Sequence, residues 1–165
     1  MRKGRATILI AAVAICLVAA ADSCSSTGTG PGGSSPAAKV NKLDANLNGY
    51  ELKVTEVVRN APANEFSKPD AGNHFVKVTV SFINNSSDKQ HPDTFCCKLK
   101  DSTGITHTSD YSATGCDLWE GVDIAKGAAL GPRPVCFQAA GDPNAPLFLI
   151  WSPSFGSSDV EIALQ

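Results

Sequence analysis

The sequence predicts an all-β domain, built as two sheets packed in a sandwich, behind an export signal and a flexible tether. From Lys39 onward, short runs of alternating apolar and polar residues are separated by clusters of Gly, Pro, Asn and Asp. Such a pattern is typical of strands and turns. No helical stripe of convincing length interrupts it. About seven short strands with such turns suit a two-sheet sandwich of roughly 100 residues.

The first 23 residues have the layout of a secretory signal peptide. Arg2, Lys3 and Arg5 precede an apolar run over residues 6–21 that only Thr7 interrupts. A positive start followed by a short apolar core is the pattern of an export signal. A spanning helix needs about 20 apolar residues, so this shorter run predicts a segment that is removed. We therefore assign residues 1–23 to a cleaved signal peptide.

Two cleavage sites compete at the end of this segment. In the first, residues 21–24 serve as a lipobox, and cleavage leaves Cys24 as an acylated, palmitate-type N-terminus at the outer face of the cell membrane. In the second, the three alanines at 19–21 fit the small-x-small rule of ordinary signal peptidase, and a secreted protein begins at Asp22. The charge of Asp22 departs from the lipobox pattern, whereas Ser23 fits it. Lipid attachment is the favoured alternative, and secretion stays open.

Residues 24–45 are predicted to form the lipid-anchor Cys and a flexible linker. The stretch is rich in Gly, Ser, Pro and Thr, and such a composition buries too little apolar surface to fold. Residues 46–165 are predicted to fold as one domain, since a chain of 165 residues with 18% charged side chains suits a single globular unit.

Two strands open the predicted domain, and a loop joins them. Residues 50–58 alternate until Val57 and Val58 break the pattern, which predicts a bulge. Residues 75–83 form the clearest strand, because four apolar side chains alternate with side chains of the other face. Residues 60–73 contain two prolines and a glycine and are predicted to be the loop.

Shorter strands complete the predicted sandwich. Residues 95–100 alternate, and a Gly-containing turn at 101–104 leads into a strand over residues 105–109. Residues 110–134 carry no regular pattern and are predicted to be a long irregular segment. The remaining strands are predicted over residues 135–139, 147–151 and 160–164.

Two motifs carry a family resemblance. The run Phe75-Val76-x-Val78-x-Val80-x-x-x-Asn84, followed by Leu99-x-Asp101-x-x-Gly104, resembles an immunoglobulin-like domain-of-unknown-function family of bacterial surface lipoproteins. That family is related to the mycobacterial immunoprotective extracellular antigen. The resemblance covers about residues 46–165 and implies an immunoglobulin-like β-sandwich at the cell surface. It implies no catalytic residue, because the family has no general catalytic site.

Four cysteines lie in the predicted domain: Cys96, Cys97, Cys116 and Cys136. An even number in an exported domain predicts two disulfides. A bond between the neighbours Cys96 and Cys97 is set aside, because it needs a strained small ring and strand alternation points the two side chains to opposite faces. Of the two remaining pairings we expect Cys96–Cys136 and Cys97–Cys116, since strand parity places Cys96 and Cys136 on outward faces. Zinc is the alternative, but the usual C-x-x-C motif is missing.

The sequence motifs do not predict an enzyme, a metal site or a cofactor. His74, His91 and His107 belong to different segments, without an H-x-H or H-x-x-x-H pair. The G-x-S-x-G elbow of serine hydrolases is also missing. An uncharacterised hydrolase remains an alternative, because a catalytic triad can be assembled from residues distant in sequence.

The function we expect is that of a non-catalytic binding or interaction module, displayed outside the cytoplasm on the cell envelope as a lipoprotein. Its partner would be an unknown protein or envelope ligand, and the lipid anchor would hold it at the membrane. Nucleic acid is not expected, because the net charge is −2 and the domain has no basic cluster. A structural accessory protein of the envelope and a secreted antigen-like protein are the alternatives.

Residues 110–131 of the irregular segment are the candidate binding loop. Long loops on a stiff scaffold carry recognition disproportionately often. Asp117, Trp119 and Glu120 are the candidate contacts, because an exposed Trp is a frequent binding anchor. The alternative is that Trp119 folds back and caps the sandwich, with Cys116 pinning the segment.

Overall fold

The computed structural model describes residues 38–40, 43–153 and 158–164. In these residues the elements are β1 (Ala38–Val40), β2 (Asp44–Leu47), β3 (Tyr50–Ala61), β4 (Asn73–Asn84), η1 (Thr94–Cys96), β5 (Cys97–Lys100), β6 (Thr106–His107), β7 (Ala129–Ala140), β8 (Leu147–Trp151) and β9 (Val160–Leu164). The 3-10 turn η1 is the one helical element of this part of the chain. No helix in it is long and apolar enough to cross a membrane.

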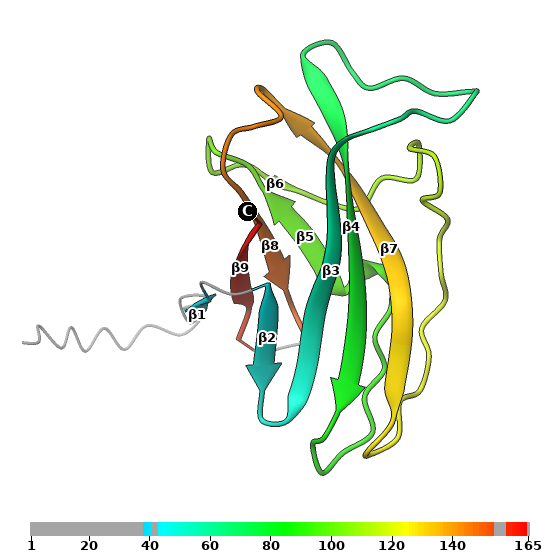
Figure 1. Ribbon diagram of the computed structural model, residues 1–165, viewed down its shortest axis with the longest axis vertical. Coiled ribbons are helices and arrows are strands. Elements are labelled where there is room, and N and C mark those ends of the chain that lie inside the picture. The colour runs from blue at the N-terminus through cyan, green and yellow to red at the C-terminus, as the bar shows by residue number, and fades with distance from the viewer. Residues whose placement is uncertain (1–37, 41–42, 154–157, 165) are drawn as a thin grey trace, which may run out of the picture. The chain divides into compact units, whose positions relative to one another are not determined.

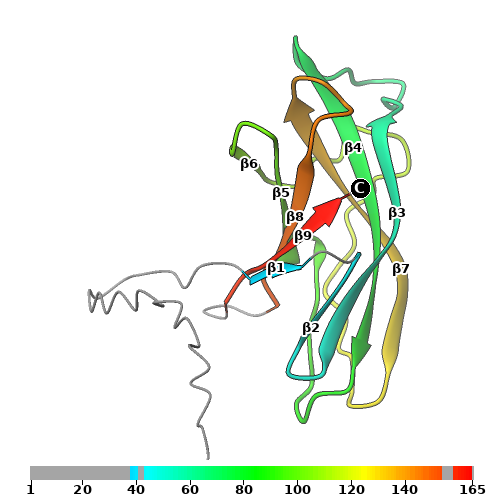
Figure 2. The same ribbon diagram turned by 60° about the vertical axis from the view of Figure 1, so that its left-hand side comes forward.

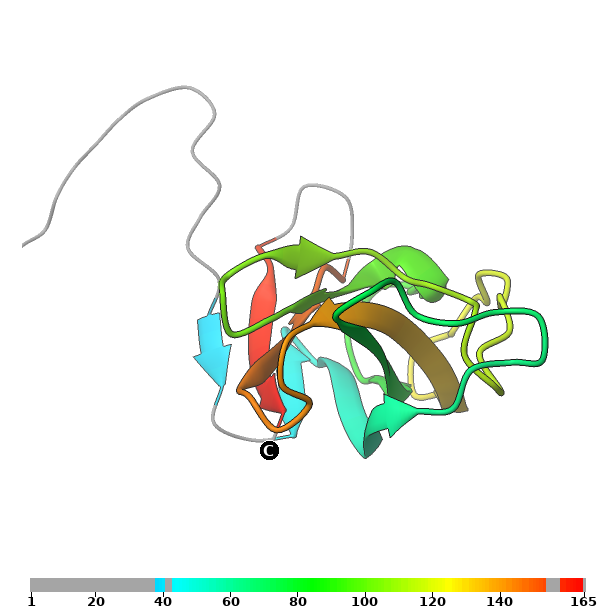
Figure 3. The ribbon, with the colours of Figure 1, turned by 90° about the horizontal axis from the view of Figure 1, so that it is seen from above.

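The strands form two facing sheets, which confirms the predicted all-β sandwich (Figure 1). One sheet has the order β1-β9-β8-β5-β6 and the other has the order β2-β3-β4-β7. All neighbouring strands pair antiparallel except β1 and β9, which pair in parallel. Figures 2 and 3 show the two layers from the side and from above.

The core lies between the sheets and follows the predicted alternation. Val76, Val78, Val80 and Phe82 of β4 are fully buried, and they share one face because successive strand residues point to opposite sides. The facing sheet contributes apolar side chains from three strands. They are Cys97, Leu99, Leu147, Leu149, Trp151, Val160, Ile162 and Leu164.

Strand β7 is longer than the sequence predicts, because it begins at Ala129 instead of residue 135. Pro132 and Pro134 lie within it. Because prolines are typical of loops, residues 129–134 resemble a loop in the sequence. A proline cannot donate a ladder hydrogen bond, so it is tolerated where a strand has a free edge. Strand β7 has such an edge, since it pairs with β4 alone among the strands.

Two strands lie at positions that the sequence assigned to the linker. Strand β1 pairs with β9, and β2 pairs with β3 from Asp44 onward. The side chain of Ala45 is buried in the core. Residues 1–37, with the predicted signal peptide and Cys24, lie outside the described residues.

Candidate functional site

The predicted binding loop covers the free edge of β7. We call residues 108–128, between β6 and β7, the cover segment; it runs beside β7 in Figure 1. The backbone N–H of Asp110 donates to the carbonyl of Cys136 over 2.7 Å. The indole N–H of Trp119 donates to the carbonyl of Pro134 over 3.0 Å. The segment thereby satisfies backbone groups that an open sheet edge would expose.

Trp119 packs against the core, as the capping alternative predicts. Its ring lies 6.3 Å from the ring of Phe82, measured between centroids, and it packs against the main core. The hydroxyl of Thr94 donates to the carbonyl of Trp119 over 2.7 Å and accepts from its N–H over 3.1 Å. Of the three predicted contacts, Asp117 and Glu120 are exposed, whereas Trp119 is half-buried. The structure therefore matches the capping alternative.

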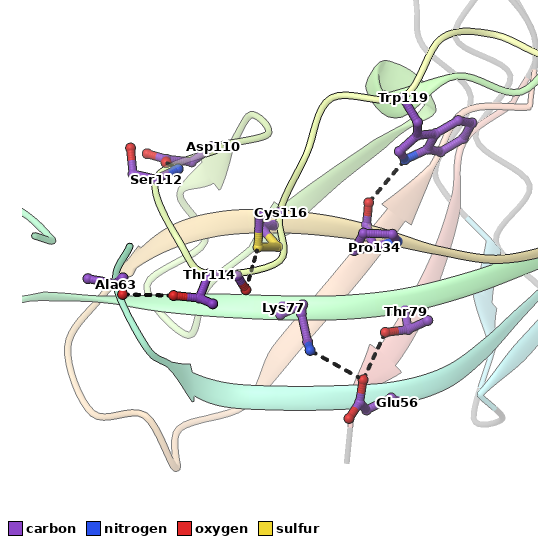
Figure 4. Close-up of a disulfide and its surroundings, with 11 residues drawn as sticks. Glu56, Ala63, Lys77, Thr79, Asp110, Ser112, Thr114, Cys116, Trp119 and Pro134 are labelled. Atoms are coloured by element: carbon purple, nitrogen blue, oxygen red, sulfur yellow. Dashed lines mark hydrogen bonds and ion pairs between the residues drawn. A yellow bond between two sulfur atoms is a disulfide. The ribbon is translucent and has the colours of Figure 1, made fainter. Parts of the chain in front are cut away.

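The observed disulfide joins Cys116 to Cys136 (Figure 4), so the expected pairing of Cys96 with Cys136 and of Cys97 with Cys116 is wrong. Strand parity correctly placed Cys136 outside the main core. The cover segment brings Cys116 to that same outer face, where both sulfurs pack in a second apolar cluster with Phe75. Parity could not identify this partner, because an irregular segment has no periodicity that fixes its position.

Cys96 and Cys97 are free thiols, and their sulfurs lie 3.4 Å apart. The prediction that they point to opposite faces is also wrong. Cys96 ends the turn η1 and Cys97 begins β5. Strand alternation applies only within a strand, so it does not relate two residues on either side of this junction.

A hollow of about 360 Å³ lies at the sandwich end formed by the β2–β3 turn and the loop after β4. We call it the loop-end pocket. Its size falls within the range of ligand sites in proteins. Polar side chains dominate its lining, with a few apolar groups between them. The lining residues are Leu47, Asn48, Tyr50, Ser86, Ser87, Asp88, Gln90 and Pro153.

Asn84 holds one wall of the loop-end pocket. Its side chain is fully buried. The amide nitrogen donates to the carbonyls of Asp88 and Ile124, each over 2.8 Å. The amide oxygen accepts from the N–H and the hydroxyl of Ser86 over 3.1 and 2.6 Å. These four bonds satisfy the amide completely, so the wall is formed before any ligand arrives.

Gly49 fixes the opposite wall. Its carbonyl accepts from the N–H of Asn85 over 2.7 Å. Its φ is +86°, and a Cβ atom there would lie 2.9 Å from backbone atoms of Asn85. Glycine is therefore required at this position, and the two rims of the pocket are tied to each other through backbone.

Tyr50 lines the pocket and carries a buried hydroxyl without a partner. The residue is 3% exposed, and its hydroxyl has no hydrogen-bond partner among the described residues. Burial raises the pKa of Tyr50, and the nearby Cys96 and Cys97 raise it further, so the hydroxyl keeps its proton. Buried polar groups without partners are rare in native proteins. This donor marks a place where an acceptor would be stabilised.

A second hollow, of about 340 Å³, is lined by polar residues beside β6 and β7. The ring of His107 lies on its wall and bonds the carboxylate of Asp101 over 2.7 Å. The hydroxyl of Ser109 bonds that of Tyr111 instead, over 3.0 Å. Within the described part of the chain no hydroxyl bonds His107, so the structure assembles a carboxylate–histidine pair but no triad there.

The other histidines occupy two further environments. His74 is buried, and burial lowers its pKa. His91 is exposed and bonds Asp123 over 2.7 Å. Within residues 38–40, 43–153 and 158–164, no group of three or more His, Cys, Asp or Glu side chains is placed to bind a metal ion.

Comparisons with known proteins give a family and a fold. A family model described as "Domain of unknown function (DUF4352)" matches residues 39–127, and it indicates no enzyme class. None of the curated proteins matches the sequence.

Several solved structures share the sandwich. The Bacillus subtilis protein ycdA, a candidate lipoprotein, has a TM-score of 0.61 and 14% identity over 76% of this chain and 39% of its own. This chain thus spans about two fifths of ycdA. The yjhA protein of Bacillus subtilis has a TM-score of 0.55 and 14% identity over 78% of this chain and 99% of its own. MPT63, a secreted protein of Mycobacterium tuberculosis, has a TM-score of 0.51 and 14% identity over 78% of this chain and 97% of its own.

Proposed function

The chain belongs to the DUF4352 family, and from this premise we propose that it is a non-catalytic binding module of the cell envelope. The observation that carries the proposal is the loop-end pocket, whose walls are held by Asn84 and Gly49 and whose lining includes Tyr50. A preformed hollow with a few directed polar groups is the usual form of a binding site.

The lining of the pocket favours an uncharged, hydroxyl-rich ligand. Asn48, Ser87 and Gln90 offer amide and hydroxyl groups, while Asp88 is its one charged residue. Such groups exchange hydrogen bonds with sugar hydroxyls in both directions. We infer that a saccharide unit of the envelope is the class of ligand that fits.

A titration of the mature protein with envelope oligosaccharides tests this proposal. Amide signals of Asn48, Ser86 and Gln90 should shift in nuclear magnetic resonance spectra. Replacement of Gln90 by Ala should weaken binding about tenfold, which corresponds to about 1.4 kcal/mol. Replacement of Thr106 by Ala in the second hollow is the matched control and should change nothing. Shifts confined to residues 106–110, or none with any oligosaccharide, would refute the pocket as the site.

The place of the module is proposed on separate grounds. The charged and apolar start of the chain has the layout of an export signal. The similar structures include a candidate lipoprotein and a secreted protein. We propose attachment through an acylated Cys24 to the outer face of the cell membrane. Mass spectrometry of the mature N-terminus decides between an acylated Cys24 and a secreted chain that begins at Asp22.

A further inference from the structure

The junction between η1 and β5 places two thiols side by side. The turn η1 is capped by Asp93, whose side chain accepts from the N–H of Phe95 over 2.8 Å. Cys97 then adopts the extended conformation, with φ −127° and ψ 145°. This change of backbone conformation turns both side chains the same way, and the two sulfurs lie 3.4 Å apart.

The two thiols differ in access. Cys97 is 1% exposed and belongs to the core, whereas Cys96 is partly exposed. The hydrogen bond with Cys96 and burial both raise the pKa of Cys97, so this thiol is protonated until it reacts. A reagent in solution therefore reacts with Cys96 first. Cys97 can then react only with the sulfur of Cys96.

Two residues next to this pair carry buried donors without a partner among the described residues. Trp151 stands opposite Cys97 in the β5–β8 ladder, and its indole N–H is buried without a partner among the described residues. Tyr50 packs edge-on against Trp151, with centroids 5.1 Å apart, and its hydroxyl is unpartnered as well. Buried donors of this kind stabilise a neighbour that carries negative charge, as a thiol sulfur does once it has given up its proton and before it attacks.

We propose that Cys96 and Cys97 form a thiol–disulfide exchange site, which a disulfide oxidant closes into a disulfide between the two neighbouring residues. The strained small ring disfavours this bond as a permanent staple, but strained disulfides are the readily reduced ones that an exchange site uses. Cys96 gives up its proton and attacks one sulfur of the oxidant; the other sulfur leaves, takes that proton and becomes a thiol. Cys97 then attacks the sulfur of Cys96 in the mixed disulfide. The second thiol of the oxidant leaves with the proton of Cys97. The protein loses two electrons and two protons, and the oxidant gains them as two thiols.

Formation of the Cys96–Cys97 disulfide should displace residues beyond the two cysteines. The sulfurs must approach from 3.4 Å to a bond length of about 2.05 Å. Cys97 is fixed in the core, so Cys96 and its turn move. Thr94 of that turn bonds Trp119, and the carbonyl of Cys96 accepts from the N–H of Ser152 over 2.8 Å. Oxidation should therefore reach Trp119 and change its fluorescence.

Incubation of the full-length mature protein with oxidised glutathione tests the proposal. The wild type should lose two hydrogens in intact mass, and peptide mapping should show Cys96 bonded to Cys97 with Cys116–Cys136 unchanged. Dithiothreitol should reverse both the mass and the fluorescence change. The variant Cys97→Ser should stop at a glutathione adduct on Cys96. The variant Cys96→Ser should take up no glutathione on Cys97, because Cys97 is buried; peptide mapping separates any adduct on Cys24 from one in the domain.

Three results would overturn the proposal. The wild type could retain glutathione on Cys96, which would show that Cys97 does not attack. The wild type could stay a dithiol while the Cys97→Ser variant forms its adduct. Cys96 could also fail to react in the Cys97→Ser variant with its circular dichroism spectrum unchanged, which would show that it is unreachable.

Discussion

Asp101 shows how one buried side chain holds a turn. One carboxylate oxygen accepts from the N–H of Thr103 over 2.9 Å, from its hydroxyl over 2.6 Å and from the N–H of Ile105 over 3.1 Å. The other oxygen bonds His107 over 2.7 Å. Burial alone raises the pKa of Asp101, but the bonds from Thr103, His107 and Ile105 outweigh it and lower the pKa to about 2.

This carboxylate predicts an acid-sensitive step in stability. The folded pKa of about 2 lies below the ordinary value of 3.8, so the charged form stabilises the fold above about pH 4. That contribution is lost as the pH falls from about 4 through 2. Asp101→Asn should flatten this part of the profile in urea unfolding. Asp101→Ala should cost about 1 to 3 kcal/mol at neutral pH. Parallel acid profiles of wild type and Asp101→Asn would contradict the assignment.

Trp119 gives a second prediction at the residue scale. As a cap that packs on Phe82 and donates to the carbonyl of Pro134, Trp119→Ala should lower the free energy of unfolding by about 3 kcal/mol. Trp119→Phe keeps most of the packing and should lose about 1 kcal/mol with the indole bond. Leu118→Ala is the control, because Leu118 is 55% exposed. Thermal stability unchanged in Trp119→Ala would restore the anchor hypothesis.

At the scale of elements, the cover segment occupies the edge of β7 where a further strand could otherwise pair. It is tied to β7 by the disulfide, and the hydroxyl of Thr114 donates to the carbonyl of Ala63 over 2.8 Å (Figure 4). These ties hold an irregular segment against a sheet edge without a regular ladder. They protect β7 from pairing with another chain.

Loss of this disulfide should loosen the cover segment first. The bond links residues 20 positions apart, so the double variant Cys116→Ser, Cys136→Ser should lose about 3 kcal/mol. Hydrogen exchange should rise over residues 109–119 more than over β3 and β4. The fully buried β4 side chains provide the internal reference. Uniform acceleration in all strands would show that the segment unfolds together with the sandwich.

Sequence patterns predicted the elements with strict alternation and missed those whose geometry depends on distant contacts. The strand ending at Asn84 was predicted because one face is buried throughout. The start of β7 was missed because Pro132 and Pro134 read as loop residues. The loop-end pocket could not be predicted, since Tyr50 and Ser86 meet there from segments that fold back on each other.

At the scale of the whole domain, the sheet edges at β7, β6 and β9 are protected in different ways. The cover segment lies along β7, and β6 is only two residues long, which gives another chain little to pair with. Strand β1 covers β9 over residues Ala38–Val40. The N-terminal strands therefore belong to the fold and are not a spacer before it.

Chains shortened from the N-terminus should reveal this contribution. A chain that starts at residue 34, where the compact unit begins, keeps β1 and β2. A start at residue 43 removes β1 and exposes one edge of β9. A start at residue 46 also removes buried Ala45 and the carbonyl of Leu43, which accepts from the N–H of Val54 over 2.7 Å. Each lost hydrogen bond costs about 1 kcal/mol, so urea midpoints should fall in the order 34, 43, 46. Equal midpoints for the first and last chains would place the start of the fold at residue 46.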